Sequence, residues 1–252
     1  MASRCLAVLL AAASVLARTP PGFTPSSETD LVVEYKGFAP MNGAVVSKSV
    51  TAAEPRIGTL ARLNGSSYAV IMIDLDIPTN NPPKTNTLLH WMQTGLVPAA
   101  SVTTLNSTSG PIRAFLLENR SNSTALAPYI GPNPPARVPL SHRYTQILVD
   151  TSGLTERGML ALQTAAKNRS GFDAPTVLAS AGLTGKVAAG NSYNVTNPGP
   201  AVAANTTDNA AGGAQGSASG TAGGRGLARR RGRRRSWLGG SAYLRYCCWV
   251  CE

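Results

Sequence analysis

The central part of this sequence contains no cysteine. Cys5 lies near the N-terminus, and the other three cysteines all lie within the last six residues. Small domains that depend on disulfides need several cysteines inside the fold. The sequence therefore excludes a disulfide scaffold between residues 18 and 200. A segment of this length can instead bury one apolar core, so we expect a single domain that is stabilised by packing.

Charged residues are also scarce, at 14% of the chain, and the net charge of +11 is unevenly distributed. Residues 225–252 contain eight arginines and one glutamate, so this segment contributes +7 and the rest of the chain only +4. A nucleic-acid-binding domain carries a basic field on its folded surface. We therefore predict no nucleic-acid partner.

The apolar run near the N-terminus, residues 6–16, is too short to span a bilayer. It follows Arg4 and leads into Val15-Leu16-Ala17, which fits the small-residue rule for signal-peptide cleavage. We predict a signal peptide at residues 1–17. The alternative is a buried N-terminal helix, but residues 19–22, Thr-Pro-Pro-Gly, are typical of an extended start of a mature chain.

Glycosylation sequons support entry into the secretory route, because each Asn-x-Ser/Thr can carry a surface glycan there. A composition rich in Asn, Ser and Thr produces some sequons by chance, so their number is supporting evidence only. We expect a secreted or cell-surface glycoprotein. The sequons begin at Asn64, Asn106, Asn119, Asn122, Asn168, Asn194 and Asn205.

Beyond the predicted domain at residues 18–200, the composition changes abruptly. Residues 201–224 consist largely of Ala, Gly, Ser, Thr and Asn, which predicts a disordered linker. Residues 225–252 form an Arg-rich tail, also predicted to be disordered. The linker resembles the attachment region of a GPI signal, but the apolar tail that such a signal needs is missing. We expect membrane-surface association through the arginines or a lost GPI anchor, and a signal peptide argues against nuclear targeting by them.

Residues 69–78 show the clearest alternation in the sequence and predict a strand. Its isoleucines occupy one face, while Met72, Asp74 and Asp76 occupy the other. Pro78 ends the strand because it has no N–H to donate. Side chains two apart lie roughly 6.6 Å from each other on one face, so the two acids can address one small site. On an edge strand they would simply lie in water.

The rest of the pattern is mainly β. Asn64-Gly65 indicates a hairpin that leads into the strand at 69–78, and the polar residues 97–111 indicate an exposed loop. Helices are expected only late, the second one closed by Gly182. Strands are predicted at residues 31–35, 87–94, 112–117 and 141–150 with short strands between 47 and 62, and helices at 155–167 and 174–180.

The whole chain has two histidines, His90 and His142, and each lies in a predicted strand. A protonated histidine donates from both ring nitrogens, and a buried carboxylate such as Asp74 favours that form and can orient the ring. Tyr144 adds a hydroxyl donor, and residues 129–135 add a rigid Pro-rich wall. These features predict a polar pocket. The alternative is a buried hydrogen-bond network that only fixes the packing of the sheet.

Four motifs resemble those of the phosphatidylethanolamine-binding protein family in order and spacing. They are Asp74-Leu-Asp-Ile-Pro78, Leu89-His-Trp91, Tyr129-Ile-Gly-Pro-Asn-Pro-Pro135 and His142-Arg-Tyr144. The resemblance covers residues 31–193 and includes Gly171-Phe-Asp173 and Ala189-Gly-Asn-Ser-Tyr193. It implies a β-sandwich of antiparallel sheets with a few short C-terminal helices. It also implies a small pocket that binds phosphate or a phospholipid head group.

The ligand-binding residues predicted from the pattern and the resemblance are Asp74, Asp76, Pro78, His90, Tyr129, Pro134, His142 and Tyr144. Three departures from the family pattern affect the mouth of this pocket. Leu75 replaces a proline, Asn133 replaces a glycine, and one additional residue lies between Pro135 and His142. All candidate polar ligands are retained.

Two further functions compete with anion binding. Fungal members of the family include an inhibitor of a vacuolar serine carboxypeptidase, so the resemblance also implies inhibition of a protease through a surface segment. An enzyme would need a metal site or an acid/base set built from the acids and histidines. The sequence has no local metal signature and no obvious Ser or Cys nucleophile. We therefore predict no catalytic residue, no metal and no cofactor.

Overall fold

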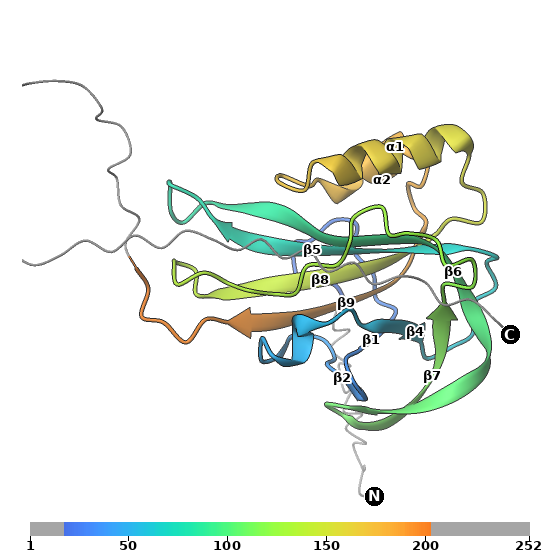
Figure 1. The fold of residues 1–252 in the computed structure, drawn as a ribbon, viewed down its shortest axis with the longest axis horizontal. Helices are drawn as coiled ribbons and strands as arrows, with labels where there is room; N and C mark the ends of the chain where they lie inside the picture. Colours follow the sequence, from blue (N-terminus) through green and yellow to red (C-terminus); the bar gives the residue numbers. More distant parts are fainter. Residues whose placement is uncertain (1–17, 203–252) are drawn as a thin grey trace, which may run out of the picture. The chain divides into compact units, whose positions relative to one another are not determined.

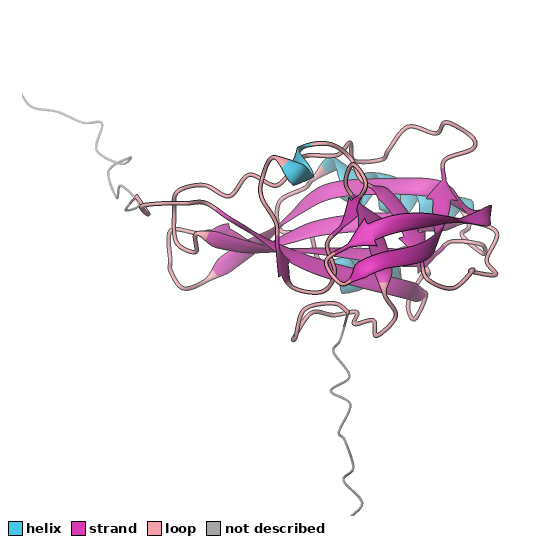
Figure 2. Cartoon of the chain, turned by 90° about the horizontal axis from the view of Figure 1, so that it is seen from below, coloured by secondary structure: helices cyan, strands magenta, loops and turns pink. Residues whose placement is uncertain are grey.

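The structure is a computed structural model that describes residues 18–202. The predicted signal peptide, the Arg-rich tail and all but the first two residues of the predicted linker lie outside the described residues. The described chain is mainly β, as predicted, with two short α-helices near its C-terminal end (Figure 2). Its elements are β1 Leu31–Glu34, β2 Phe38–Ala39, β3 Ala44–Val45, the 3-10 helix η1 Val50–Ala52, β4 Arg56–Thr59, β5 Tyr68–Pro78, β6 Thr85–Ser107, β7 Gly110–Glu118, β8 Ser141–Asp150, α1 Glu156–Lys167, α2 Ala174–Ser180 and β9 Val187–Thr196.

The strands form one curled sheet in the order β1-β4-β7-β6-β5-β8-β9-β3, and β2 pairs with β6. The 23-residue strand β6 joins the two halves of this sheet, because it pairs with β5 up to Leu96 and with β7 from Val97 onward. Gly95 lies beside this change of partner with a φ of +75°, a conformation that glycine adopts without steric cost. The two layers of the predicted sandwich are therefore halves of a single sheet.

Alternation along β5 divides the core into two main layers. Met72 and Val70 join a cluster that includes Leu31 of β1 and Ile57 of β4, so this layer lies between the sheet halves. Ile71 and Ile73 join a second cluster that includes residues of both helices. Figure 1 shows α1 and α2 along this second face. The predicted division of β5 into two faces is confirmed at these positions.

The two helices begin and end close to their predicted bounds. Thr155 caps α1, since its hydroxyl accepts a hydrogen bond from the Gly158 backbone N–H. Gly158 has to be small, because a Cβ atom there would lie 2.5 Å from the Ala181 carbonyl oxygen at the end of α2. Gly182 follows α2 with a φ of +71°, as expected of a C-terminal glycine. Neither of these helices is long and apolar enough to cross a membrane.

Two expectations about the strands are wrong, and one strand was not predicted. β4 and β5 do not pair, so Asn64-Gly65 is not a hairpin turn but part of a connection between the two sheet halves. Residues 97–111 are mostly strand rather than loop, because the second half of β6 pairs with β7 and exposes its polar side chains on the outer surface. β9 was not predicted as a strand, since Gly190 and several polar residues interrupt its apolar pattern.

Candidate functional site

Three adjacent strands bring the two histidines to Asp74. In the pairing of β5 with β8, Asp74 lies opposite Tyr144, two residues after His142. His90 belongs to β6, which pairs with β5 on the side away from β8. There Trp91 pairs with Met72 and Leu89 pairs with Ile73, so His90 is an additional residue without a partner in β5. Such a bulge redirects a side chain without breaking the sheet. It places His90 beside Tyr144, with their ring centres 5.2 Å apart.

The Asp74 carboxylate is the centre of the site. Its Oδ2 atom lies 2.8 Å from His142 Nδ1 and 3.9 Å from His90 Nε2. Its Oδ1 atom accepts a hydrogen bond of 2.9 Å from the Asp76 backbone N–H. Asp74, His90 and His142 are 1%, 4% and 0% exposed, respectively, so the carboxylate and both rings are shielded from solvent. Electrostatic interactions in such an environment are stronger than in water.

The backbone of the Pro-rich loop fixes the tautomer of His90. His90 Nδ1 lies 2.7 Å from the carbonyl oxygen of Ile130, which can only accept, so Nδ1 carries the hydrogen. Burial lowers the pKa of His90 below its ordinary value of 6.5, in spite of the nearby Asp74. His90 is therefore neutral at pH 7, and its Nε2 atom has a lone pair that faces Asp74.

Both Nε2 atoms are buried and have no hydrogen-bond partner among the described residues. Buried polar atoms in folded proteins are nearly always paired, and an unpaired one costs about 1–3 kcal/mol. His142 Nδ1 is already bonded to Asp74, and His90 Nδ1 to the loop, so each ring has only its Nε2 atom left. Each of these atoms can accept from, or after protonation donate to, a small polar group.

Tyr144 covers the two rings and supplies a hydroxyl group. Its ring lies 5.2 Å from that of His90 in an edge contact and 6.4 Å from that of His142 in a stacked contact. Burial raises the pKa of Tyr144 above its ordinary value, and the neighbouring Asp74 raises it further. The hydroxyl therefore keeps its proton and can serve as a donor.

Asp76 does not share the partners of Asp74. Its carboxylate accepts from the backbone N–H of Arg143 at 2.8 Å and from the guanidinium at 2.8 and 2.7 Å. Burial raises the pKa of Asp76, but the hydrogen bonds from Arg143 outweigh this effect and leave the pKa below its ordinary value. The pairing of β5 with β6 shifts register between Asp74 and Ile77, so strict alternation does not hold there.

The remaining predicted site residues lie around this centre. Tyr129 belongs to a tyrosine cluster: its hydroxyl donates to the Thr51 carbonyl at 2.7 Å and contacts the Tyr35 hydroxyl at 3.3 Å. Pro78 is the half-buried last residue of β5. Pro134 is buried, and its carbonyl accepts from the Asn197 amide at 2.9 Å. The structure thus brings four predicted residues together at the centre: Asp74, His90, His142 and Tyr144.

Two positions of the site were missed by sequence reasoning. Ile130 acts through its backbone carbonyl, which no side-chain pattern reveals. Tyr193 stacks on Tyr144 at 5.8 Å and hydrogen-bonds Tyr35 at 2.6 Å through the hydroxyl groups. Its only sequence signal is the resemblance motif at 189–193. Within residues 18–202, three or more His, Cys, Asp or Glu side chains nowhere gather in a metal-binding arrangement.

One family model matches most of the described chain. The sequence profile described as "Phosphatidylethanolamine-binding protein" matches residues 41–194, a segment that contains every predicted site residue. The protein "Phomoidride biosynthesis cluster protein N" of Talaromyces stipitatus is 28% identical over 198 residues, which are 71% of this chain and 91% of that protein. "CEN-like protein 1" of Nicotiana tabacum is 32% identical over 97 residues, 38% of this chain and 54% of that protein.

The solved structures that match this chain have low sequence identity to it. The carboxypeptidase Y inhibitor, in a complex with its cognate proteinase, is 18% identical with a TM-score of 0.47, and the match covers 68% of this chain and 84% of that chain. A phosphatidylethanolamine-binding protein from Plasmodium vivax is 19% identical with a TM-score of 0.44, over 70% of this chain and 91% of that chain.

Proposed function

This chain belongs to the phosphatidylethanolamine-binding protein family, and on that premise we propose that it binds a small anionic group at Asp74, His90, His142 and Tyr144. The shared chemistry of the ligand is a phosphate, either free or as the head group of a phospholipid. The proposed role is binding and not catalysis. The carrying observation is the pair of buried Nε2 atoms, one on each histidine, that have no partner in the described part of the chain.

Protonation makes these atoms suited to an anion. Neutral His90 presents a lone pair, which repels a phosphate oxygen. Protons taken up at both Nε2 atoms on binding turn these two atoms into donors, and Asp74 stabilises the positive charge because its Oδ2 atom lies 2.8 Å from His142 and 3.9 Å from His90. The Tyr144 hydroxyl adds a neutral donor. Anion binding at this site is therefore coupled to proton uptake.

Access to the site requires movement, because both imidazoles are almost wholly shielded from solvent. The segment at Ile130 is held against β6 by two hydrogen bonds, from Ile130 N–H to the His90 carbonyl and from His90 Nδ1 to the Ile130 carbonyl. A ligand reaches the Nε2 atoms only when this segment moves away from β6. Binding that requires such a step is slower than diffusion-limited association.

The test is a calorimetric titration of the full chain with phosphorylethanolamine and with inorganic phosphate. We expect binding by the wild type and its loss in the His90→Gln/His142→Gln double variant. Arg120→Gln is the matched control for a lost cation, since Arg120 is exposed and pairs with Glu118 at the surface. Titrations in buffers of different ionisation enthalpy count the protons taken up. A folded wild type that binds neither ligand would contradict the proposal.

The same double variant separates anion binding from protease inhibition. Inhibition through a surface segment does not use the buried histidines. If the chain inhibits a serine carboxypeptidase, and the double variant inhibits it equally well while neither phosphate ligand binds, the inhibitor function replaces the one proposed here. Inhibition lost together with phosphate binding would instead assign both to the histidine site.

We also propose secretion and glycosylation of this protein. Four sequon asparagines are exposed and have no side-chain hydrogen bond in the described chain, whereas the Asn119 and Asn194 amides donate to backbone carbonyls at 2.8 and 3.2 Å. Expression in a secreting eukaryotic host, followed by glycopeptide mapping, tests both points. Retention in the cell without glycans would contradict them. We expect glycans at Asn64, Asn106, Asn122 and Asn168.

A further inference from the structure

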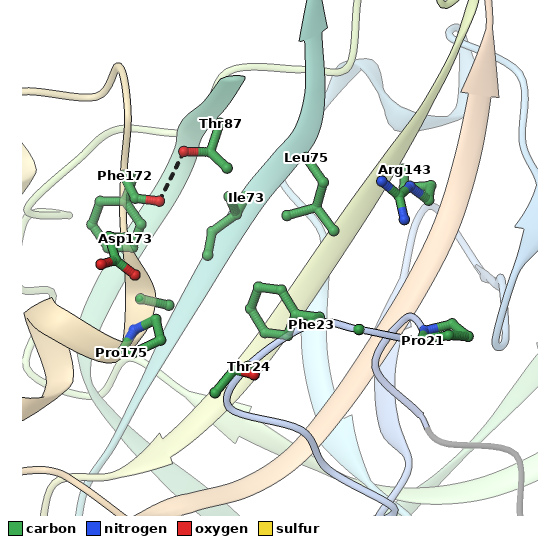
Figure 3. Close-up of a pocket in the computed structure, with 12 residues that line it drawn as sticks. Pro21, Phe23, Thr24, Ile73, Leu75, Thr87, Arg143, Phe172, Asp173 and Pro175 are labelled. Atoms are coloured by element: carbon green, nitrogen blue, oxygen red, sulfur yellow. Dashed lines mark hydrogen bonds between the residues drawn. The ribbon is translucent and has the colours of Figure 1, made fainter. Parts of the chain in front are cut away.

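A cavity of about 360 Å³ lies against the face of β5 opposite the histidine site. Its floor is formed by Ile73 and Leu75, which flank Asp74 but point away from it. One wall comes from residues 21–24 and the other from residues 172–175, at the start of α2 (Figure 3). The volume lies at the lower end of the range of roughly 300–1,000 Å³ that is typical of small-molecule sites. None of the predicted anion-binding residues lines it.

Each wall of this cavity carries one phenylalanine. Phe23 faces the two floor residues, and Phe172 closes the side next to β6, where its carbonyl accepts a hydrogen bond of 2.9 Å from the Thr87 hydroxyl (Figure 3). The segment that carries Phe23 is closed on itself, because the backbone N–H of Arg18 donates to the Ser27 carbonyl at 2.8 Å. Aromatic walls of this kind favour a flat or aliphatic ligand body.

Arg143 supplies the cation at one end of the cavity. Asp76 accepts from its Nε and from one hydrogen of Nη2. A guanidinium has five N–H donors, so both hydrogens of Nη1 and the second hydrogen of Nη2 are left. They form a second fork with the geometry that a carboxylate accepts in two parallel hydrogen bonds. The Arg143 side chain is 48% exposed, so this fork is accessible.

The charges around the cavity determine the kind of acid that fits. Asp76 already balances the charge of Arg143 and holds its orientation, which favours a singly charged group over a doubly charged phosphate. Asp173 lies at the opposite end, across β5 and β6 from Arg143 (Figure 3). Its carboxylate repels an acid from that end, so a ligand carboxylate is directed to Arg143 and its apolar body to the two phenylalanines.

We propose that this cavity binds small monocarboxylic acids with an apolar body, with the carboxylate on Arg143 and the body between Phe23 and Phe172. The site is separate from the phosphate site, because β5 lies between them, and it does not depend on the proposed function. An aliphatic or an aromatic body fits the same chemistry, and two probes distinguish them. Octanoate represents the aliphatic acids and 4-phenylbutyrate the aromatic ones.

The experiment uses the full ¹⁵N-labelled chain and follows amide shifts during titration with each acid. We expect shifts at residues 22–24, 73–75 and 172–174. The neutral 4-phenylbutyramide should bind at least about tenfold more weakly than the acid, since the charge-assisted pair is lost. Arg143→Lys keeps the charge opposite Asp76 but loses the fork, so it should weaken acid binding about tenfold. Phe23→Ala should weaken both acids and the amide.

Arg120→Lys is the matched control, because Arg120 also pairs with a carboxylate through Nε, at 2.8 Å. Arg120 follows β7 and does not line the cavity. It should leave acid binding unchanged. The proposal is overturned if neither acid binds to the folded wild type, or if Phe23→Ala and Arg143→Lys bind both acids like the wild type. It is also overturned if His90→Gln/His142→Gln abolishes acid binding while Phe23→Ala does not, since the acids would then occupy the phosphate site.

Discussion

The two faces of strands β5 and β8 carry two acid–base pairs with opposite properties. On one face Asp74 contacts His142 and His90, and all three side chains are buried. Burial lowers the pKa of His90, so His90 is neutral at pH 7. Arg143 lines the cavity on the other face and contacts Asp76, and the Arg143 side chain is half-exposed and permanently charged. The difference shows how neighbouring residues on one strand can build a closed site that responds to protons and an open one that does not.

The energetics of the two pairs follow from burial. The Asp74 site has buried hydrogen-bonding atoms that no residue between 18 and 202 pairs with, and a ligand that bonds them would remove the free-energy cost of leaving them unpaired. The Asp76 pair is bidentate and half in water, so it is satisfied without a ligand. Variants that remove one acid at a time separate these contributions.

We expect the largest effect from Asp74→Ala. It removes the acceptor of His142 Nδ1 and of the Asp76 N–H, and two buried donors without partners cost about 4 kcal/mol of unfolding free energy. Asp173→Ala, on the exposed rim of the other face, should cost less than about 1 kcal/mol. Urea denaturation measures both. Equal losses in the two variants would mean that burial does not distinguish the faces.

Leu162→Ala should come next, with a loss of about 3 kcal/mol, because Leu162 is 0% exposed and anchors α1 on the second core layer. Leu160 lies two residues earlier on the same helix and is 62% exposed. Leu160→Ala should therefore change the unfolding free energy by less than about 0.5 kcal/mol. Phosphate binding should survive in both variants, since α1 lies across the sheet from the histidines. Loss of binding in folded Leu162→Ala would show that the faces are coupled.

Asp76→Ala should have a smaller effect than either, about 2 kcal/mol, because the half-exposed Arg143 can turn into water when its partner is lost. Urea denaturation at pH 7 measures it. The variant should keep phosphate binding, since the backbone N–H of residue 76 still donates to Asp74. A loss as large as that of Asp74→Ala would show that the two acids act as one unit, as their spacing in the sequence first predicted.

The sequence was sufficient to predict the class of the fold and the central cluster. Alternation identified β5 and β8, apolar spacing identified α1, and the rarity of histidine drew attention to His90 and His142. These signals are local. They depend on side-chain type and on a period of two or 3.6 residues, and both can be read without knowing which strands are neighbours.

The features that were missed depend on long-range pairing. A bulge makes His90 the additional residue of β6, and a second register shift separates the partners of Asp76 from those of Asp74. Neither register shift has a glycine or proline between the shifted pairs, so the sequence gives no local sign of an irregular strand there. The polar outward side chains in the second half of β6 predict a loop, and only the pairing with β7 reveals a strand. A backbone contact, such as that of the Ile130 carbonyl with His90 Nδ1, produces no side-chain pattern in the sequence.

The smallest expected effect concerns pH. Burial lowers the pKa of folded His90 below its unfolded value of 6.5, so the unfolded chain binds this proton first as the pH falls. The associated stability is complete above about pH 6.5 and is lost below it, at up to about 1.4 kcal/mol per pH unit. His90→Gln should therefore reduce the fall in unfolding free energy between pH 7.5 and 5.5, which urea denaturation at several pH values measures.

Arg143→Lys, which keeps a positive charge opposite Asp76, is the control from the other face. Asp76 raises the pKa of Arg143, and Arg143 lowers the pKa of Asp76, so neither group titrates between pH 7.5 and 5.5. This variant should lower stability by the same amount at every pH in that range, whereas His90→Gln should change the slope. An unchanged slope in His90→Gln would mean that His90 binds its proton equally well in the folded and unfolded chain, and the closed face would then lose the proton response that distinguishes it from the open one.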